Sequence, residues 1–151
     1  MDSTDSYTGF ADVYDLFMDH VPYAEWADRI DGLLREYNNL IIPDDDDLRS
    51  EAGLLVELGC GTGTLTRLLK HKGYDCIGID ISEQMLDIAI RQEDGISPDD
   101  RILYLNQDMR EFELYSTAGA FVCVCNSINY LTDDADILEV FKLVNNYLYP
   151  N

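Results

Sequence analysis

The chain has 151 residues, enough for one domain with a substantial core, and 46% of them are hydrophobic. Its net charge of −20 at pH 7 argues against a polyanionic partner, because nucleic-acid binding depends on Lys and Arg that neutralise phosphates. No apolar run in the sequence is long enough to span a bilayer. We therefore expect neither nucleic acid nor a membrane among its partners.

The four cysteines indicate the cellular compartment. Cys60, Cys76, Cys123 and Cys125 form no C-x-x-C pair, and no His stands at a ligand spacing from them, so we expect no metal. Three of them lie in or beside predicted buried strands, where a free thiol behaves as a small apolar group. The polar first residues lack the apolar segment of a secretion signal. These features together predict a cytoplasmic protein in a reducing environment.

Two amphipathic segments precede the first predicted strand. Residues 7–17 are rich in aromatic side chains, and residues 20–37 carry apolar side chains at helical spacing. We expect two helices, residues 1–42 forming an N-terminal helical segment. Residues 43–52 contain four consecutive aspartates and read as a solvated loop, since a calcium loop needs alternating ligands and a glycine. Residues 53–151 then form the main core. The predicted inner face of the second helix consists of Tyr23, Trp26, Ile30, Leu33, Leu34 and Tyr37.

A glycine-rich turn organises this core. Residues 54–63 read L-L-V-E-L-G-C-G-T-G, which predicts a buried strand, a tight turn and a helix from Thr64. A dinucleotide-binding turn has the spacing G-x-G-x-x-G, and its third glycine would fall at Thr64. The spacing here is E-x-G-x-G-x-G, so an NAD-dependent oxidoreductase is the less favoured alternative.

This motif resembles that of the class I S-adenosylmethionine-dependent methyltransferases of the small-molecule type. The resemblance implies an α/β fold, a three-layer doubly wound parallel sheet of Rossmann-like type. It also implies that the N-terminal segment closes over the cofactor as a lid, because Tyr7, Phe10, Tyr14 and Asp15 loosely match an opening segment of the family. The residues that the resemblance assigns to S-adenosylmethionine in these two regions are Tyr14, Glu57, Gly59, Cys60, Gly61 and Gly63.

The second predicted strand, residues 74–79, ends at Asp80. An acidic residue here, about 20 residues past the glycines, is placed to accept hydrogen bonds from both ribose hydroxyls. Ser82 is expected to cap a helix that runs to Arg91. The resemblance places Ile81 and Met85 against the adenine ring, although plain core packing explains Met85 equally well.

The third predicted strand, residues 101–107, ends at Asp108. The resemblance implies that Asp108 takes the adenine amino group and that Met109 covers the ring. An ionised carboxylate suits such a donor because it only accepts hydrogen bonds. The fourth predicted strand, residues 119–125, is followed by a helix from Asp133 to about Leu148. We expect that helix to turn inward the side chains of Ile137, Leu138, Phe141, Val144 and Leu148.

The glycine turn, Asp80, Asp108 and Asn126 all follow predicted strands. Open parallel sheets bind ligands at the carboxyl ends of their strands, so this agreement strengthens the resemblance, which implies a methyltransferase with a small-molecule acceptor. Methyl transfer mainly requires positioning and the exclusion of water. Asn126 and Tyr130 are the catalytic candidates by position, and Asn126 is also expected to bind the cofactor. The N-P-P-Y-type sequence of some amino-group methyltransferases is missing, so the acceptor atom stays open. The alternative is a non-catalytic cofactor-binding module or subunit.

The family fold has seven strands, and this chain ends earlier. We expect the strand order 3-2-1-4 with the C-terminal strands absent, the last residues (L-Y-P-N) leading toward a fifth strand. The chain would then be truncated, and its fourth strand would be an exposed edge. Because such an edge invites pairing with another chain, we expect a possible homodimer through Phe121 to Cys125.

Overall fold

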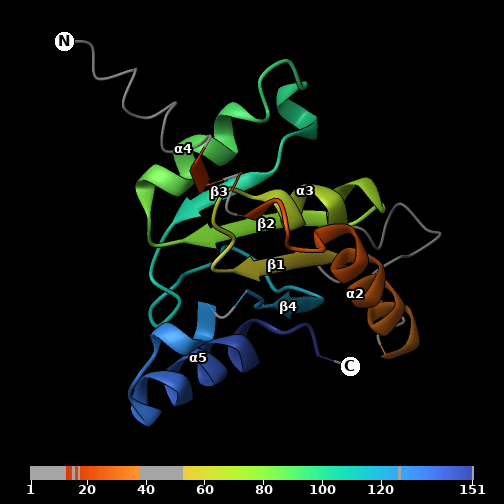
Figure 1. Cartoon of the computed structure of the whole chain (residues 1–151). Helices are drawn as coiled ribbons and strands as arrows, with labels where there is room; N and C mark the ends of the chain where they lie inside the picture. The colour runs from red at the N-terminus through yellow and green to blue at the C-terminus, as the bar shows by residue number, and fades with distance from the viewer. Residues whose placement is uncertain (1–12, 15, 17, 38–52, 126, 151) are drawn as a thin grey trace.

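The computed structural model describes residues 13–14, 16, 18–37, 53–125 and 127–150 of the chain (Figure 1). Helices and strands alternate as far as the third strand, and the fourth strand then follows without a helix between them, as the sequence predicts. In chain order the elements are α2 (Tyr23–Tyr37), β1 (Leu54–Leu58), α3 (Thr64–His71), β2 (Asp75–Asp80), α4 (Glu83–Arg91), the 3₁₀ helix η2 (Pro98–Asp100), β3 (Leu103–Asn106), β4 (Ala120–Val122), the 3₁₀ helix η3 (Ser127–Tyr130) and α5 (Asp134–Tyr147).

The four strands form one parallel sheet in the predicted order, β3-β2-β1-β4. β1 pairs with β2 along its full length and with β4 on its other side. β3 pairs with β2 as far as Asp80↔Asn106. Because all pairs are parallel, the carboxyl ends of the strands lie along one edge of the sheet. The polar residues that follow these strands are therefore brought to that edge.

Side chains alternate between the two faces of the sheet and create its layers. Leu55 faces α2 and α3, where it packs with Leu65 and Leu69. Val56 faces the other side, where it packs with Phe112 and with Val140 of α5. Figure 1 shows α2 and α3 lying together and α5 lying beyond β4. The three-layer arrangement is confirmed.

Two strands are shorter than predicted. β3 begins at Leu103 rather than at residue 101, because the Ile102 N–H donates to the buried carboxylate of Glu93 (3.1 Å) instead of to a neighbouring strand. β4 ends at Val122 rather than at residue 125. The chain turns away there, and Cys125 has a left-handed backbone (φ 58°) that no regular strand contains. Local hydrogen bonding and backbone geometry thus end both strands where side-chain hydrophobicity alone would continue them.

The amino end of β4 is covered by the last described residues. After α5, Leu148 forms a parallel bridge with Ala118. The Ala118 N–H donates to the Tyr147 carbonyl (2.7 Å), and the Tyr149 N–H donates to the Ala118 carbonyl (2.8 Å). These bonds place Leu148 and Tyr149 beside the amino end of β4, and the fifth strand itself stays a prediction. The β4 edge is consequently less exposed than the sequence suggests.

The inner face of α5 differs from the prediction. Leu138, Phe141 and Leu148 are 54%, 60% and 38% exposed, so their assignment to the core is wrong. Val140 is buried instead, and Tyr147 packs on Phe112 with ring centroids 5.6 Å apart. The aromatic contact and the return of the chain to Ala118 set the rotation of the helix, which apolar spacing alone leaves ambiguous.

Gly78 of β2 lies beneath the ring of Tyr104. A Cβ at Gly78 would lie 2.7 and 2.9 Å from two ring carbons of Tyr104 and 2.9 Å from Cys60 Sγ. We expect Gly78→Ala to lower the free energy of unfolding by about 1–3 kcal/mol, because one of these groups must move. Urea denaturation measures this change.

Gly32 in α2 provides the matched control. A Cβ there would meet no atom within 4 Å. Gly32→Ala should therefore raise the free energy of unfolding by about 0.5–1 kcal/mol, the usual gain within a helix. Equal effects of the two substitutions would contradict the crowding at Gly78.

Candidate functional site

The turn after β1 requires its glycines for conformational reasons. Gly59, Gly61 and Gly63 have φ values of 71°, 56° and 74°, a left-handed region that other residues rarely adopt. The N–H groups of Gly59 and Cys60 both donate to the carbonyl of Ile79 (2.7 and 3.0 Å), which ties the turn to β2. The alternate spacing of the glycines thus reflects alternate left-handed residues.

Two other loops meet this turn at Gly59. A Cβ on Gly59 would lie 2.5 Å from Cβ and Oγ of Ser127 and 3.5 Å from Cε of Met109. Ser127 Oγ also donates toward the carbonyls of Gly59 (3.2 Å) and Val124 (2.9 Å). Only a glycine permits the loops after β3 and β4 to approach so closely.

Asp80, at the end of β2, joins the turn to the next helix. Its Oδ2 accepts the Gly61 N–H and its Oδ1 accepts the Ser82 N–H, both at 2.8 Å. Ser82 caps α4 as predicted, its hydroxyl accepting the Met85 N–H (3.4 Å). Because each carboxylate oxygen can accept two hydrogen bonds, one position on each oxygen of Asp80 remains for a ligand.

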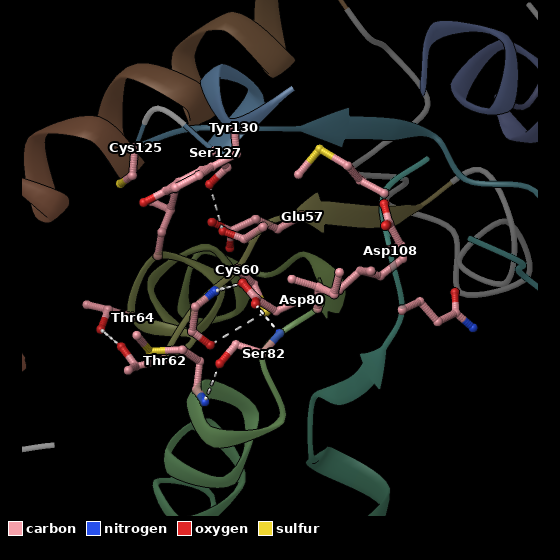
Figure 2. A pocket seen from close by; sticks show the side chains of 18 of the residues that line it. Glu57, Cys60, Thr62, Thr64, Asp80, Ser82, Asp108, Cys125, Ser127 and Tyr130 are labelled. Carbon is pink, nitrogen blue, oxygen red and sulfur yellow. Dashed lines mark hydrogen bonds between the residues drawn. The ribbon is translucent and has the colours of Figure 1, made fainter. Parts of the chain in front are cut away.

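These segments enclose a cavity of about 540 Å³, a typical size for a small-molecule site. Figure 2 shows Glu57 and Asp80 within it, Ser82 on the side of α4, and Ser127 and Tyr130 on the side of the β4 loop. Gly63 does not line the cavity and packs against Tyr104. Asn126 lies outside the described residues. The predicted residues that do line the cavity are Tyr14, Glu57, Gly59, Cys60, Gly61, Asp80, Ile81, Met85, Asp108, Met109 and Tyr130.

The sequence interpretation missed Tyr23 and Cys125. Tyr23 packs against the core as its helix stripe predicts, but it also lines the cavity, and its hydroxyl lies 3.8 Å from Cys125 Sγ. In the same stripe the core assignment of Leu33 and Tyr37 is wrong, because they are 42% and 74% exposed. Burial and the neighbouring Cys125 raise the pKa of Tyr23 above its usual value, so the phenol stays protonated. The left-handed Cys125 carries backbone strain of the kind that gathers at functional sites. Met18 and Arg110 were also missed, and only the strand-end position of Arg110 could have indicated it.

Glu57 is an ionisable group buried in this site. It is 3% exposed, and its carboxyl accepts a hydrogen bond from the Thr66 hydroxyl of α3. Burial, and to a smaller extent the charge of Asp80, raises the pKa of Glu57 to about 8, although the Thr66 hydrogen bond opposes this. The carboxyl is therefore mainly protonated at neutral pH. A cation that entered the cavity would favour its ionised form.

This buried proton should make stability depend on pH. The folded protein keeps the proton up to about pH 8, whereas the unfolded chain loses it near 4.5, so the free energy of unfolding should fall as the pH rises through this window. Glu57→Gln cannot ionise, and we expect its melting temperature to fall less between about pH 5 and about pH 9. The exposed control Glu111→Gln should follow the unsubstituted chain, and identical curves for the two variants would contradict the assignment.

The part of the chain that the structure describes contains neither a metal-binding cluster nor a membrane-spanning helix. No group of three or more His, Cys, Asp or Glu side chains there could hold a metal ion. None of its helices combines the length and hydrophobicity needed to cross a membrane. All four cysteines are free thiols.

Known proteins share both the sequence pattern and the fold. YqeM of Bacillus subtilis (strain 168), whose name describes it as a methyltransferase, is 38% identical over 95% of this chain and 51% of its own length. The dTDP-3-amino-3,4,6-trideoxy-alpha-D-glucopyranose N,N-dimethyltransferase of Streptomyces venezuelae is 36% identical over 93% of this chain and 53% of its own. This chain spans about half the length of the curated relatives it matches.

A solved structure extends the similarity to three dimensions. The S-adenosylmethionine-dependent methyltransferase from Clostridium acetobutylicum ATCC 824 has a TM-score of 0.75 and 29% identity, covering 95% of this chain and 54% of that chain. The family model described as a methyltransferase domain matches residues 55–151, from within β1 to the end of the chain. The chain therefore belongs to the methyltransferase domain family and has the fold of a class I S-adenosylmethionine-dependent methyltransferase.

Proposed function

We propose that this chain is the cofactor-binding part of an enzyme that transfers a methyl group from S-adenosylmethionine to a small molecule. The observation that carries this proposal is the convergence of the glycine turn, Asp80 and Asp108 on one cavity. Three strand ends supply these groups, as expected for a nucleoside ligand at the edge of a parallel sheet.

The residues of the cavity fit this cofactor. S-adenosylmethionine carries a sulfonium and an ammonium, and three carboxyl groups, those of Glu57, Asp80 and Asp108, line the cavity. Among the described lining residues Arg110 is the one cation, and it is paired with Asp108. The free acceptor positions on Asp80 suit the two ribose hydroxyls. A cationic ligand is thus favoured over a pyrophosphate, which would need positive charge around it.

The remaining site residues receive roles consistent with their positions. In this proposal Asp108 accepts the adenine amino group, and Ile81, Met85 and Met109 contact the ring. Ile81 is 68% exposed, a large apolar surface that a bound base would cover. Tyr14 supports a lid role for the N-terminal segment, because its hydroxyl lies within 3.4 Å of a Cβ built on Gly61.

The bound cofactor supplies an activated methyl group on its sulfonium. The residues of the chain then have to bind, orient and exclude water. Tyr130, 87% exposed at the cavity, and Asn126 are proposed to contact the acceptor. Tyr23 stays protonated and can donate a hydrogen bond, whereas it is unsuited to act as a base. A neutral amine can attack a methyl group without prior loss of a proton, so an amine acceptor requires no base from the described lining residues.

A small-molecule amine is therefore the acceptor we propose. The similarity to an enzyme named for N,N-dimethylation of an amino sugar nucleotide supports this class. The net charge of −20 supports the exclusion of nucleic acid as an acceptor. Four free thiols support a reducing, cytoplasmic location.

Thermal unfolding with added ligands tests the cofactor. At about 100 times its Kd a ligand adds roughly 2.7 kcal/mol of stability, which corresponds to a shift of roughly 5–10 °C for a chain of this length. We expect S-adenosylmethionine and S-adenosylhomocysteine to produce this shift and NAD to produce none. Asp80→Ala should abolish the shift, whereas Asp75→Ala, an exposed position at the start of β2, should keep it.

Two outcomes would decide against the cofactor assignment. A shift with NAD alone would indicate an oxidoreductase, and no shift with any of the three would reject the site. The acceptor is then tested by measuring S-adenosylhomocysteine formation with a panel of amines and hydroxyl compounds, including amino sugar nucleotides. Turnover with hydroxyl compounds alone would contradict the amine.

We also propose that two copies of the chain pair through Phe121 to Cys125. The support is the position of β4 at the edge of the sheet, with Leu148 bridging only its amino end at Ala118. Light scattering should show a mass that rises toward that of a dimer with concentration. A constant monomer mass would contradict the pairing.

A further inference from the structure

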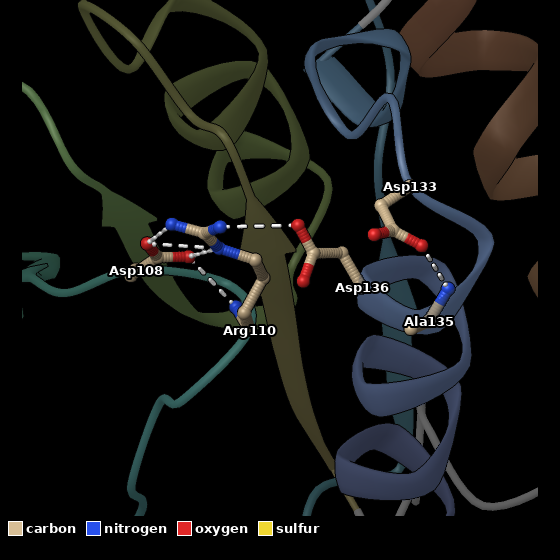
Figure 3. A network of polar contacts seen from close by, with 5 residues as sticks. All are labelled: Asp108, Arg110, Asp133, Ala135 and Asp136. Atoms are coloured by element: carbon tan, nitrogen blue, oxygen red, sulfur yellow. Dashed lines mark hydrogen bonds and ion pairs between the residues drawn. The ribbon is translucent and has the colours of Figure 1, made fainter.

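Arg110 connects two carboxylates that come from separate segments (Figure 3). Its Nε lies 3.0 and 3.1 Å from the two oxygens of Asp108, its Nη2 donates to Oδ2 at 2.6 Å, and its backbone N–H donates to Oδ1 at 2.9 Å. Its Nη1 donates to Asp136 of α5 at 3.1 Å. Asp108 is therefore held by four donated contacts from one residue.

These contacts fix how Asp108 is presented to the cavity. The Asp108 side chain is only 15% exposed, whereas that of Arg110 is 45% exposed. Oδ1 accepts the backbone N–H, Oδ2 accepts Nη2, and the two oxygens share Nε, so each oxygen keeps part of its acceptor capacity. The guanidinium also holds the pKa of Asp108 below its usual range. The cavity thus contains a carboxylate of defined orientation that can only accept hydrogen bonds.

A contribution to the stability of the fold does not explain why Arg110 pairs with Asp108 and Asp136. Asp136, the far partner, is 37% exposed, and ion pairs between exposed groups contribute little to stability because solvent screens them. Asp136 also lies in the first turn of α5, where an acidic residue is favourable without any partner. The feature that distinguishes this ion pair from other exposed pairs is its contact with a cavity residue. We therefore expect the ion pairs of Arg110 to affect ligand binding.

We propose that Arg110 is a positioning residue for the cofactor, acting through Asp108, with Asp136 anchoring the outer end of its guanidinium. Arg110 holds the carboxylate in an orientation in which one of its oxygens can accept an N–H donor of the bound base. This inference rests on the proposed function, because it assigns the base to Asp108. It makes base selectivity, rather than fold stability, the property that depends on Arg110.

The test compares the affinities of two ligands by calorimetry on the 151-residue chain. S-adenosylhomocysteine carries the adenine amino group, and S-inosylhomocysteine carries an oxygen in its place. We expect Arg110→Gln to raise the Kd of the adenosyl compound roughly tenfold and to leave that of the inosyl compound within about twofold. Arg110→Lys keeps the charge without the planar fork, so it should restore only part of the affinity.

Two further variants separate positioning from other effects. Lys142→Gln removes a similarly exposed ion pair, with Glu139 of α5, away from the cavity, and it should change neither Kd. If Arg110 acts through Asp108, then Arg110→Gln should weaken binding no further in an Asp108→Asn background. Melting temperatures without ligand should agree within about 2 °C for Arg110→Gln and Lys142→Gln, since both pairs are exposed.

The outcomes of these binding measurements distinguish a failure of the positioning role from a failure of the proposed function. Equal losses for both ligands, or a further tenfold loss in the Asp108→Asn background, would overturn the positioning role. Unchanged affinity in Arg110→Gln would overturn it as well and would leave the cofactor assignment intact. Absence of binding to the unsubstituted chain would instead reject the proposed function and, with it, this inference.

Discussion

The site depends on one carboxylate. Asp80 accepts a hydrogen bond from Gly61 in the turn after β1 and another from Ser82 at the start of α4, both at 2.8 Å. Through these bonds a single side chain sets the spacing between the glycine turn and the next helix. Each oxygen still keeps a position for a ligand. Asp80 thus joins two segments of the fold and also provides acceptor atoms for a ligand. A substitution at this residue would therefore affect both the fold and ligand binding.

The second constraint is electrostatic. The cavity gathers the carboxyl groups of Glu57, Asp80 and Asp108, and the fold manages each of them differently. Backbone amides bind Asp80, a guanidinium binds Asp108, and burial keeps a proton on Glu57. Such a cavity suits a cationic ligand, because the protein balances the negative charge of these carboxyl groups only in part and the ligand would balance the rest. The net charge of the whole chain, −20 at pH 7, is also negative and favours a cationic ligand in the same way.

The comparison of sequence and structure shows where local patterns suffice. The glycine spacing predicts left-handed residues, and all three glycines adopt them. Ser82 predicts a helix cap, and it forms one. Patterns fail where partners come from distant segments. The apolar stripe of α2 predicts that Tyr23 packs on the core, which it does, but it does not predict the contact with Cys125, 102 positions away. The exposure of Leu138 and Phe141 likewise follows from the way α5 docks, which helical spacing cannot specify.

The sequence by itself determined where the strands, the turn and the acidic residues at strand ends lie along the chain, because glycine spacing and buried runs act over a few neighbouring residues. The tertiary structure alone decided which groups meet. It brought Ser127 onto Gly59 and placed Arg110 between Asp108 and Asp136. It also protonated Glu57 by burying it. These outcomes depend on distances and desolvation between segments far apart in the chain, and neither quantity can be read from one segment.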